Sequence, residues 1–380
     1  MGDDAIGSAP IGSQPIETQP IETQPMSTVE IGEQLSSLDV EAATLVRRSG
    51  RHRAPDADER VEYVDTNLFS GPIAVQRRSA IADTGITVHP LCLGGSTFGW
   101  TLDPEAAFQV LDRFAGIGGD FVDTADSYAA GRSELMIGAW LKSRRQQGRV
   151  AVATKIGRHP DAPGLSPASI RAGVDASLSR LGIERIDLLY FHGEDPATPL
   201  GESLGEVDSL IRAGKVRAIG ASDFSPDALI EARVLAANGL PRFEALTVEY
   251  HLMQRRAYEG ARELVAHAQG IAVLPYFALA GGFLAGAVRR RADIRHDARG
   301  SRVARHLNRR GHRVLGALDA VAFKHGVEPA TVALAWLTAK PGVVAPVASA
   351  ADPEQVDALM AAASLQLSRS DLVELDRASA

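Results

Sequence analysis

Four polar residues suited to proton transfer occur at or just after the ends of apolar runs. Asp123 and Tyr128 lie in FVDTADSY, Lys155 ends VAVATK, and His192 ends DLLYFH. A phenol has a pKa of about 10, and a neighbouring ammonium lowers that value by stabilising the phenolate. We expect Lys155 to act in this way on Tyr128, and Asp123 to pair with Lys155 and keep it charged. His192, as a neutral hydrogen-bond donor, would orient a substrate carbonyl.

Each of these side chains alone also has a purely structural explanation. His192 would be a satisfied core histidine and Asp123 a cap. Tyr128 would be a loop aromatic, and Lys155 a strand end whose stem is buried. The four together, at successive strand ends, favour an acid catalyst. Such a group protonates an oxygen while a second group delivers hydride, and because no protein side chain supplies hydride, a nicotinamide cofactor is implied.

The elements that must position these residues are apolar runs that alternate with stretches of helical period. A hairpin is expected over Ala74–Ile86, and N-caps at Asp103 and Ser166, each ahead of a proline. The candidate strands are Leu91–Gly94, Phe121–Thr124, Val150–Lys155, Ile186–His192, Val216–Ser222, Ala245–His251, Ile271–Tyr276 and Val343–Ala348. The candidate helices are Pro104–Phe114, Ser133–Leu141, Pro167–Leu181, Leu204–Ala213, Pro226–Ala237 and Tyr258–Ala268. Strands that are apolar on both faces imply a parallel sheet covered by helices, and eight such units favour a (β/α)8 TIM barrel, whose chemistry lies where the strands end.

The composition divides the 380 residues into a barrel over 73–380 and an acidic extension and linker over 1–60. Residues 13–26 read SQPIETQPIETQPM, and proline at every fifth position prevents helix and strand ladders. We therefore expect disorder over 1–60, apart from a short helix around Gly32–Val46. The net charge is −7, but the first 45 residues hold eight acidic side chains and no Lys or Arg. The rest of the chain is nearly neutral, which gives no support for a nucleic-acid partner.

The single cysteine, Cys92, excludes an intramolecular disulfide and every multi-cysteine metal site, so no metal is expected. It fits a reducing compartment, and with no secretory signal at the start a cytoplasmic location is expected. The stretch Gly270–Val288 carries no charge, but Pro275 and several glycines interrupt it. A buried strand running into a small-residue loop explains it better than a membrane helix. The oligomeric state stays open.

The sequence resembles the aldo-keto reductases from Ala74 to Ala378. The motifs that carry the resemblance are GGDFVDTADSYAAGRSE, VATKIG, LLYFHGED, GKVRAIGASDFS and PYFALAGGFLAG. The resemblance implies a barrel that uses NADPH, or less often NADH, to reduce aldehydes and ketones. It also implies a tetrad of Asp123, Tyr128, Lys155 and His192 in which the phenol is the general acid and base. The segments GGSTFGWTLD and APVASAADPEQVDAL look like a bacterial branch of the family.

The expected nicotinamide site departs from the family's pattern. Ser222 and Asp223 stand where the family has Ser-Asn, and Thr247 stands where it has Gln. An ionised carboxylate only accepts hydrogen bonds. Near the ring it would also favour the oxidised cofactor, by about 3 kcal/mol at about 5 Å and an effective dielectric near 20 before screening. We therefore expect Asp223 to weaken binding of the reduced cofactor or to shift the reaction toward alcohol oxidation, unless it is protonated or turned toward a backbone amide.

The resemblance places the remaining ligand contacts on three segments. Tyr276 would stack on the nicotinamide, and Trp100 would border the substrate pocket. VASAADPEQ, where the family receives the adenosine 2′-phosphate, holds no base. Arg302, or the run Arg289–Arg291, could supply that charge, which favours NADPH, with NADH as the alternative. The further cofactor residues are Phe277, Leu279, Gly281, Ser349 and Gln355.

The sequence thus predicts an oxidoreductase acting on the CH–OH or C=O group of a small molecule. Two alternatives keep the same barrel. One is a redox-neutral epimerase or lyase that uses the same tetrad. The other is a non-catalytic, nucleotide-binding regulatory subunit, which the changes at Asp223 and Thr247 would allow.

Overall fold

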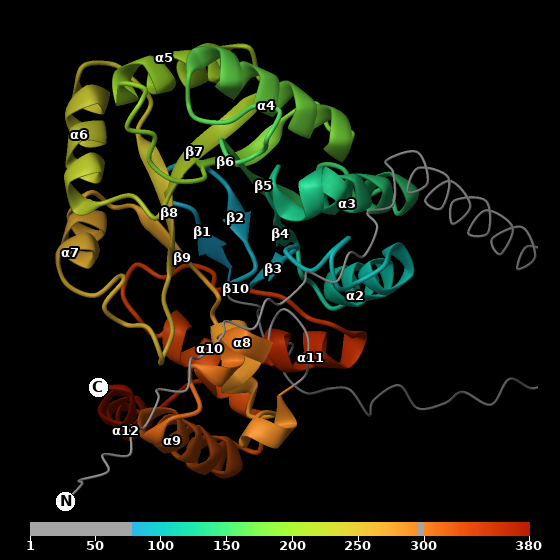
Figure 1. The fold of residues 1–380 in the computed structure, drawn as a ribbon, viewed down its shortest axis with the longest axis vertical. Helices are drawn as coiled ribbons and strands as arrows, with labels where there is room; N and C mark the ends of the chain where they lie inside the picture. The colour runs from blue at the N-terminus through green and yellow to red at the C-terminus, as the bar shows by residue number, and fades with distance from the viewer. Residues whose placement is uncertain (1–77, 295–299) are drawn as a thin grey trace, which may run out of the picture.

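A computed structural model describes residues 78–294 and 300–380 of the chain (Figure 1). The expected extension over 1–60, its helix around Gly32–Val46 and the first residues of the predicted hairpin lie outside the described residues.

Eight parallel strands form the barrel, and Figure 1 shows them in the middle of the molecule with helices around them. Each strand pairs with its neighbours in chain order, and β10 pairs with β3. Val273 on β9 bridges to Val343, so the ring is nearly closed. The last strand is shorter than the predicted Val343–Ala348, because Val343 and Val344 make only this isolated bridge. The strands are β3 (Cys92–Gly94), β4 (Phe121–Asp123), β5 (Ala151–Ile156), β6 (Ile186–Phe191), β7 (Val216–Ser222), β8 (Phe243–Glu249), β9 (Ala272–Tyr276) and β10 (Val347–Ala348).

The helices follow the predicted alternation. Asp103 and Ser166 are N-caps as expected, since their side chains accept hydrogen bonds from the amides of Ala106 and Ser169. The predicted helix Tyr258–Ala268 begins only at Ala261, after turns that end at Gly260. The helices are α2 (Pro104–Gly116), α3 (Arg132–Ser143), α4 (Pro167–Leu181), α5 (Leu200–Arg212), α6 (Pro226–Ala237), α7 (Ala261–Ala268), α8 (Gly300–Ala304), α9 (Arg309–His325), α10 (Pro329–Thr338), α11 (Pro353–Ala361) and α12 (Arg369–Ser379). Short 3₁₀ turns occupy η2 (Tyr128–Gly131), η3 (Ala280–Ala285) and η4 (Arg291–Asp293).

A hairpin of β1 (Ser79–Ala80) and β2 (Thr87–Val88) fills one end of the barrel. Its side chains Ile81 and Ile86 belong to the same buried cluster as the inward-facing residues of the strands. Barrel interiors are packed cores rather than pores. Because the hairpin covers the end at which the strands begin, the opposite end is left for a site.

The uncharged stretch Gly270–Val288 folds as strand β9 and turn η3, as the sequence predicts. Within residues 78–294 and 300–380, no helix has the length and apolar character needed to cross a bilayer.

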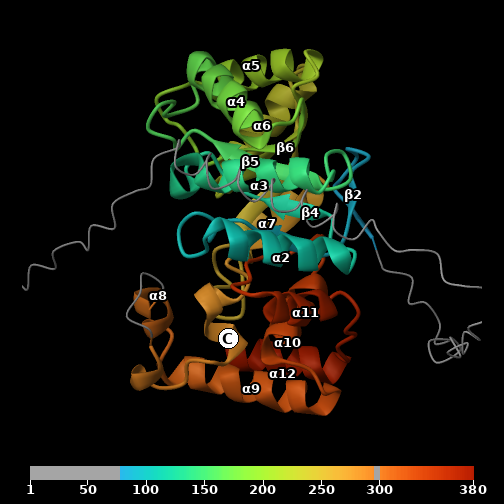
Figure 2. The same cartoon turned by 90° about the vertical axis from the view of Figure 1, so that its right-hand side faces the viewer.

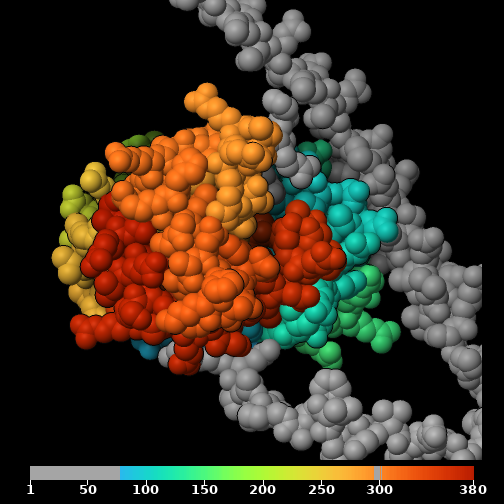
Figure 3. Space-filling view, turned by 90° about the horizontal axis from the view of Figure 1, so that it is seen from below, coloured from blue at the N-terminus to red at the C-terminus, as the bar shows by residue number. Residues whose placement is uncertain are grey.

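Helices α9 to α12 form one group beside the barrel. Figure 2 shows them together below the strands, and in Figure 3 their orange and red surface makes up much of the face that is seen from below. Helix α9 packs against both α10 and α12.

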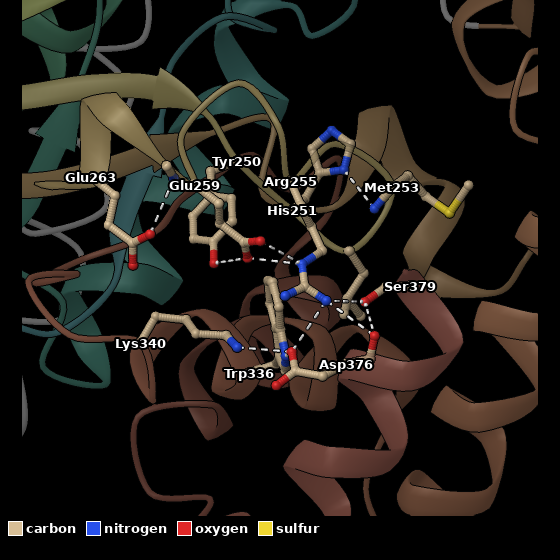
Figure 4. Close-up of polar contacts among 12 residues, drawn as sticks. Tyr250, His251, Met253, Arg255, Glu259, Glu263, Trp336, Lys340, Asp376 and Ser379 are labelled. Carbon is tan, nitrogen blue, oxygen red and sulfur yellow. Dashed lines mark hydrogen bonds and ion pairs between the residues drawn. The ribbon is translucent and has the colours of Figure 1, made fainter. Parts of the chain in front are cut away.

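A polar network ties α12 to the barrel (Figure 4). The carboxylate of Asp376 accepts hydrogen bonds from Trp336 Nε1 at 2.9 Å and from Lys340 Nζ at 2.8 Å. Arg255 binds Glu259 on its own loop and donates to the backbone carbonyl of Asp376. The network thus joins the segment after β8, helix α10 and the last helix of the chain.

Replacing Asp376 with Ala is expected to lower the free energy of unfolding by about 1–3 kcal/mol, because it leaves the donors of Trp336 and Lys340 unsatisfied. Denaturant unfolding followed by circular dichroism measures this change. Glu374→Ala on the same helix is the matched control, since that side chain is exposed. Equal stability of the two variants would contradict the role given to Asp376.

Candidate active site

Lys155 and Asp123 form a buried ion pair at the ends of β5 and β4. Lys155 is 2% exposed, and its Nζ donates to Asp123 Oδ2 at 2.5 Å and to the carbonyl of Thr124 at 2.8 Å. Burial alone would lower the pKa of Lys155, but Asp123 and Tyr128 outweigh it and the pKa lies above its ordinary value. A buried pair of this kind is stable only with both partners present. Lys155 is therefore held as an ammonium.

Tyr128 opens the turn η2 that follows β4, and its ring lies against Lys155. The ammonium is 5.0 Å from the ring centroid. Burial raises the pKa of Tyr128, and Lys155 lowers it by less, so the net shift is upward. Lys155 thus acts on Tyr128 in the expected direction, but the loss of water around the buried phenol raises the pKa by more than the ammonium lowers it. The phenol is protonated at neutral pH and available as a donor.

His192 follows β6 and faces Tyr128. The two ring centroids lie 6.0 Å apart, edge to face, and the Oγ of Ser127 is 3.5 Å from His192 Nδ1. Burial lowers the pKa of His192 to about 3, and the charges of Lys155 and Arg158 add to the effect. The imidazole is therefore neutral at physiological pH, and of its two ring nitrogens one carries a proton.

Asp126 is a buried residue of this end of the barrel that sequence reasoning missed. Its amide donates to the carbonyl of Lys155 at 2.9 Å, and its Oδ2 accepts from the amide of Gly157 at 3.2 Å. It therefore ties the turn that carries Tyr128 to the end of β5. Burial raises its pKa to about 6. The sequence signal that could have identified Asp126 is its position in DTADSY, as a second carboxylate between Asp123 and Tyr128.

Asp223 lies at the end of β7 in a left-handed conformation, with φ of 57°. Tyr276 donates its hydroxyl proton to Asp223 Oδ2 at 2.9 Å. No backbone amide of residues 78–294 or 300–380 donates to this carboxylate, so its partner is the phenol and not an amide. Burial raises the pKa of Asp223. Its neighbour Ser222 is buried, and Thr247 donates to the carbonyl of Leu274 at 2.8 Å, so this hydroxyl keeps only acceptor capacity toward a ligand.

The loop after β9 brings together several of the expected cofactor residues. Leu279 precedes η3, and the guanidinium of Arg302 lies 5.1 Å above the ring of Phe277. A side chain at Gly281 would meet only Arg302 Cβ, at 3.9 Å, and one at Gly282 would meet nothing within 4 Å. The loop and helix α8 thus offer a cation, an aromatic ring and open backbone, which fits a nucleotide with phosphate groups.

Other expected ligand residues are engaged elsewhere. Ser349 donates to the carbonyl of Gly94, and Gln355 is bonded to Ala351 and Asp352 within its own turn. Arg289 is paired with Asp319. Of the arginines considered for the 2′-phosphate, Arg302 is the one that lies against the ring of Phe277.

Trp100 follows β3 and is 49% exposed, so it is not a core plug. It stands at the same end of the barrel as the other site residues.

Residues with strained backbone are also concentrated at this end of the barrel. Of the seven non-glycine residues with positive φ in the described chain, five lie on the loops after β4, β7 and β9. Such strain clusters at functional sites. The five are Ala129, Ala130, Asp223, Phe277 and Ala280.

Buried ionisable groups at the C-terminal ends of barrel strands are typical of the active site of a (β/α)8 enzyme. Comparison with known families makes the assignment specific. The sequence model of the aldo/keto reductase family matches residues 90–380, so the chain belongs to this family.

Individual relatives agree with the family. The chain is 30% identical to an aryl-alcohol dehydrogenase of Pestalotiopsis microspora, over 80% of this chain and 82% of the relative. It is 32% identical to a norsolorinic acid reductase of Emericella nidulans, over 77% and 78% of the two chains. It is also 32% identical to the uncharacterized oxidoreductase YrpG of Bacillus subtilis, over 75% and 90%. The protein is therefore an oxidoreductase acting on CH–OH or C=O groups. Because fungal proteins stand beside the bacterial one, the expected bacterial branch is not confirmed.

Proposed function

We propose that the protein reduces a small-molecule aldehyde or ketone with NADPH, and that Tyr128 is the general acid in reduction and the base in the reverse reaction. The observation that carries this proposal is the buried Lys155–Asp123 pair against the phenol, with the neutral imidazole of His192 also in contact with the phenol ring.

Each of these side chains has a separate task in the proposal. His192 donates a hydrogen bond to the substrate carbonyl and orients it toward Tyr128. The phenol gives its proton to the carbonyl oxygen, and Lys155 stabilises the phenolate that is left. A reduced nicotinamide, when bound, supplies the hydride.

The residues proposed to hold the cofactor lie at the ends of β7 and β9 and on helix α8. Ser222, Asp223 and Tyr276 are assigned to the nicotinamide end, and Arg302 to the phosphate end. Arg302 supports NADPH over NADH, because a doubly charged 2′-phosphate favours a guanidinium partner. Replacing it with Gln is a direct test of this preference.

The activity is tested by titrating NADPH and NADH into the protein while following fluorescence, and then screening carbonyl compounds by absorbance at the reduced-nicotinamide band. Binding of NADPH and its consumption with a carbonyl support the proposal. Absence of binding at millimolar concentration of either nucleotide would overturn it. Product formed without net consumption of cofactor would instead indicate a redox-neutral epimerase or lyase.

Replacing Asp223 with Asn is expected to tighten NADPH binding by about tenfold, which corresponds to about 1.4 kcal/mol. The variant removes a negative charge beside the proposed ring site and gains a donor for the carboxamide. Binding of NADP⁺ should gain less, because the oxidised ring is positively charged. Asp161→Asn makes the same change of charge at an exposed position on the loop after β5. An unchanged NADPH dissociation constant in the Asp223 variant would contradict this expectation.

A further inference from the structure

A small polar pocket opens beside His192. Its volume is about 120 Å³, and its walls come from the loops after β5 and β6. This volume holds a group of a few heavy atoms. The pocket reaches His192 itself, so a substrate whose carbonyl is oriented by that imidazole would place its neighbouring atoms here. The lining residues are Ile156, Gly157, Arg158, Gly164, Leu165, His192, Gly193, Glu194 and Asp195.

Arg158 is the one cation among these lining residues. Its guanidinium lies across Gly193, where an added side-chain carbon would come within 3.0 Å of Arg158 Nη2. The backbone of Gly193 has φ of 135°, a conformation that favours glycine. Arg158 makes no hydrogen bond or ion pair with residues 78–294 or 300–380. The guanidinium is therefore placed at the pocket with its donors available.

Two acidic residues also line the pocket, and each accepts a hydrogen bond from a group other than Arg158. Asp195 accepts from the amides of Leu165 and Ala197 and from the hydroxyl of Thr198. Glu194 accepts from the amide of Ser225 at 2.5 Å. Both carboxylates thus hold the loops in place. Neither is paired with Arg158, which leaves the guanidinium free to bind a ligand.

The charge of Arg158 extends to the proton-transfer groups. It lowers the pKa of His192 and opposes the rise in the pKa of Tyr128. An anion bound by Arg158 would therefore lie within electrostatic range of the phenol and the imidazole. A guanidinium presents a fork of donors that matches a carboxylate or phosphate in two parallel hydrogen bonds.

We propose that Arg158 binds an anionic group of the substrate, and that the protein prefers carbonyl compounds bearing a carboxylate or another oxyanion. This proposal rests on the carbonyl reduction proposed above and specifies its substrate class. The anion is placed in the pocket between the loops after β5 and β6, while the carbonyl is held by His192 beside Tyr128.

The test compares kcat/KM for three aldehydes of one aromatic scaffold: 4-carboxybenzaldehyde, 4-formylphenyl phosphate and the neutral 4-methylbenzaldehyde. The wild-type protein is expected to prefer an anionic aldehyde over the neutral one. In Arg158→Gln that preference should fall by about tenfold to a hundredfold, the range for a hydrogen bond to a charged group. The two anions show whether the site takes a carboxylate or a phosphate. Arg158→Lys should restore part of the preference as a point charge.

Arg149→Gln is the matched control, because it removes the same charge from an exposed arginine. Arg149 lies before the start of β5, whereas Arg158 lies after the end of that strand. Its substrate preference should equal that of the wild type. Benzoate alone provides a second measurement, as a competitive inhibitor of 4-methylbenzaldehyde reduction whose inhibition constant should rise in Arg158→Gln.

The outcomes separate this inference from the proposed function. Turnover of none of the aldehydes, with no cofactor consumed, counts against the proposed function. Reduction of the neutral aldehyde as well as the anionic ones, with the same ratio in wild type and Arg158→Gln, would overturn the role of Arg158 and leave carbonyl reduction standing. An equal loss of all three activities in Arg158→Gln would also overturn it.

Discussion

Replacing Tyr128 with Phe is expected to lower kcat for carbonyl reduction by about 10²- to 10⁴-fold, the usual contribution of a positioned general acid. The change removes one hydroxyl and keeps the ring against Lys155. The dissociation constant for NADPH should therefore stay close to the wild-type value. Steady-state absorbance of the reduced nicotinamide measures the first quantity, and fluorescence titration measures the second.

Tyr250→Phe is the control for loss of a tyrosine hydroxyl from this barrel. That hydroxyl donates to Glu259 in the network that ties down the last helix. Its loss should lower stability without a selective loss of turnover. If Tyr128→Phe kept the kcat of Tyr250→Phe, another group would have to be the proton donor.

Replacing Lys155 with Met is expected to lower the free energy of unfolding by about 3–5 kcal/mol, because it leaves the buried carboxylate of Asp123 without its partner. Turnover should be lost as well, since no charge then stabilises the phenolate of Tyr128. Denaturant unfolding and steady-state kinetics of the same preparation measure both effects.

The double variant Asp123→Asn with Lys155→Met separates stability from chemistry. Removing both charges should restore most of the stability but none of the activity. Replacing both members of a buried ion pair with uncharged side chains costs little stability, whereas replacing one member leaves the other as an unpaired buried charge. A double variant as unstable as Lys155→Met would contradict the ion pair as the cause.

The stability of Lys155→Met should also depend on pH in a direction fixed by Asp123. Burial raises the pKa of this carboxyl in the folded protein, and the variant loses the opposing charge of Lys155. The folded state then binds a proton more tightly than the unfolded state, whose aspartate pKa is about 3.9. The variant should therefore gain stability as the pH falls through the raised pKa, and lose it as the pH rises. A flat profile relative to wild type would count against this account.

The barrel could be predicted because its signals are local. Strands such as Val216–Ser222 are buried along nearly their whole length, and Ser166 with Pro167 marks the start of α4 with the correct chemistry. Asp123, Lys155 and His192 could be placed together because the ends of parallel strands meet at one edge. The predicted last strand is longer than the observed β10, because Val343 and Val344 have strand-like residue types but pair only through one bridge.

Features that depend on three-dimensional packing could not be predicted. The upward shift in the pKa of Tyr128 depends on how much water the surrounding loops exclude. The bond from Tyr276 to Asp223 joins two strands that are not neighbours in the barrel. The pocket of Arg158 and His192 requires two loops that are separate in the chain. The domain boundary at residues 60–73 stays a prediction.

The most direct test of the central claim is transfer of label from the cofactor to the product. Two samples of NADPH, each deuterated at one of the two hydrogen positions on C4, are incubated separately with the protein and a reducible aldehyde. The alcohol from each reaction is analysed by mass spectrometry. The account predicts that one of the two cofactors places one deuterium on the former carbonyl carbon, and that Tyr128→Phe suppresses this product. An alcohol without deuterium from either cofactor would contradict hydride transfer at this site.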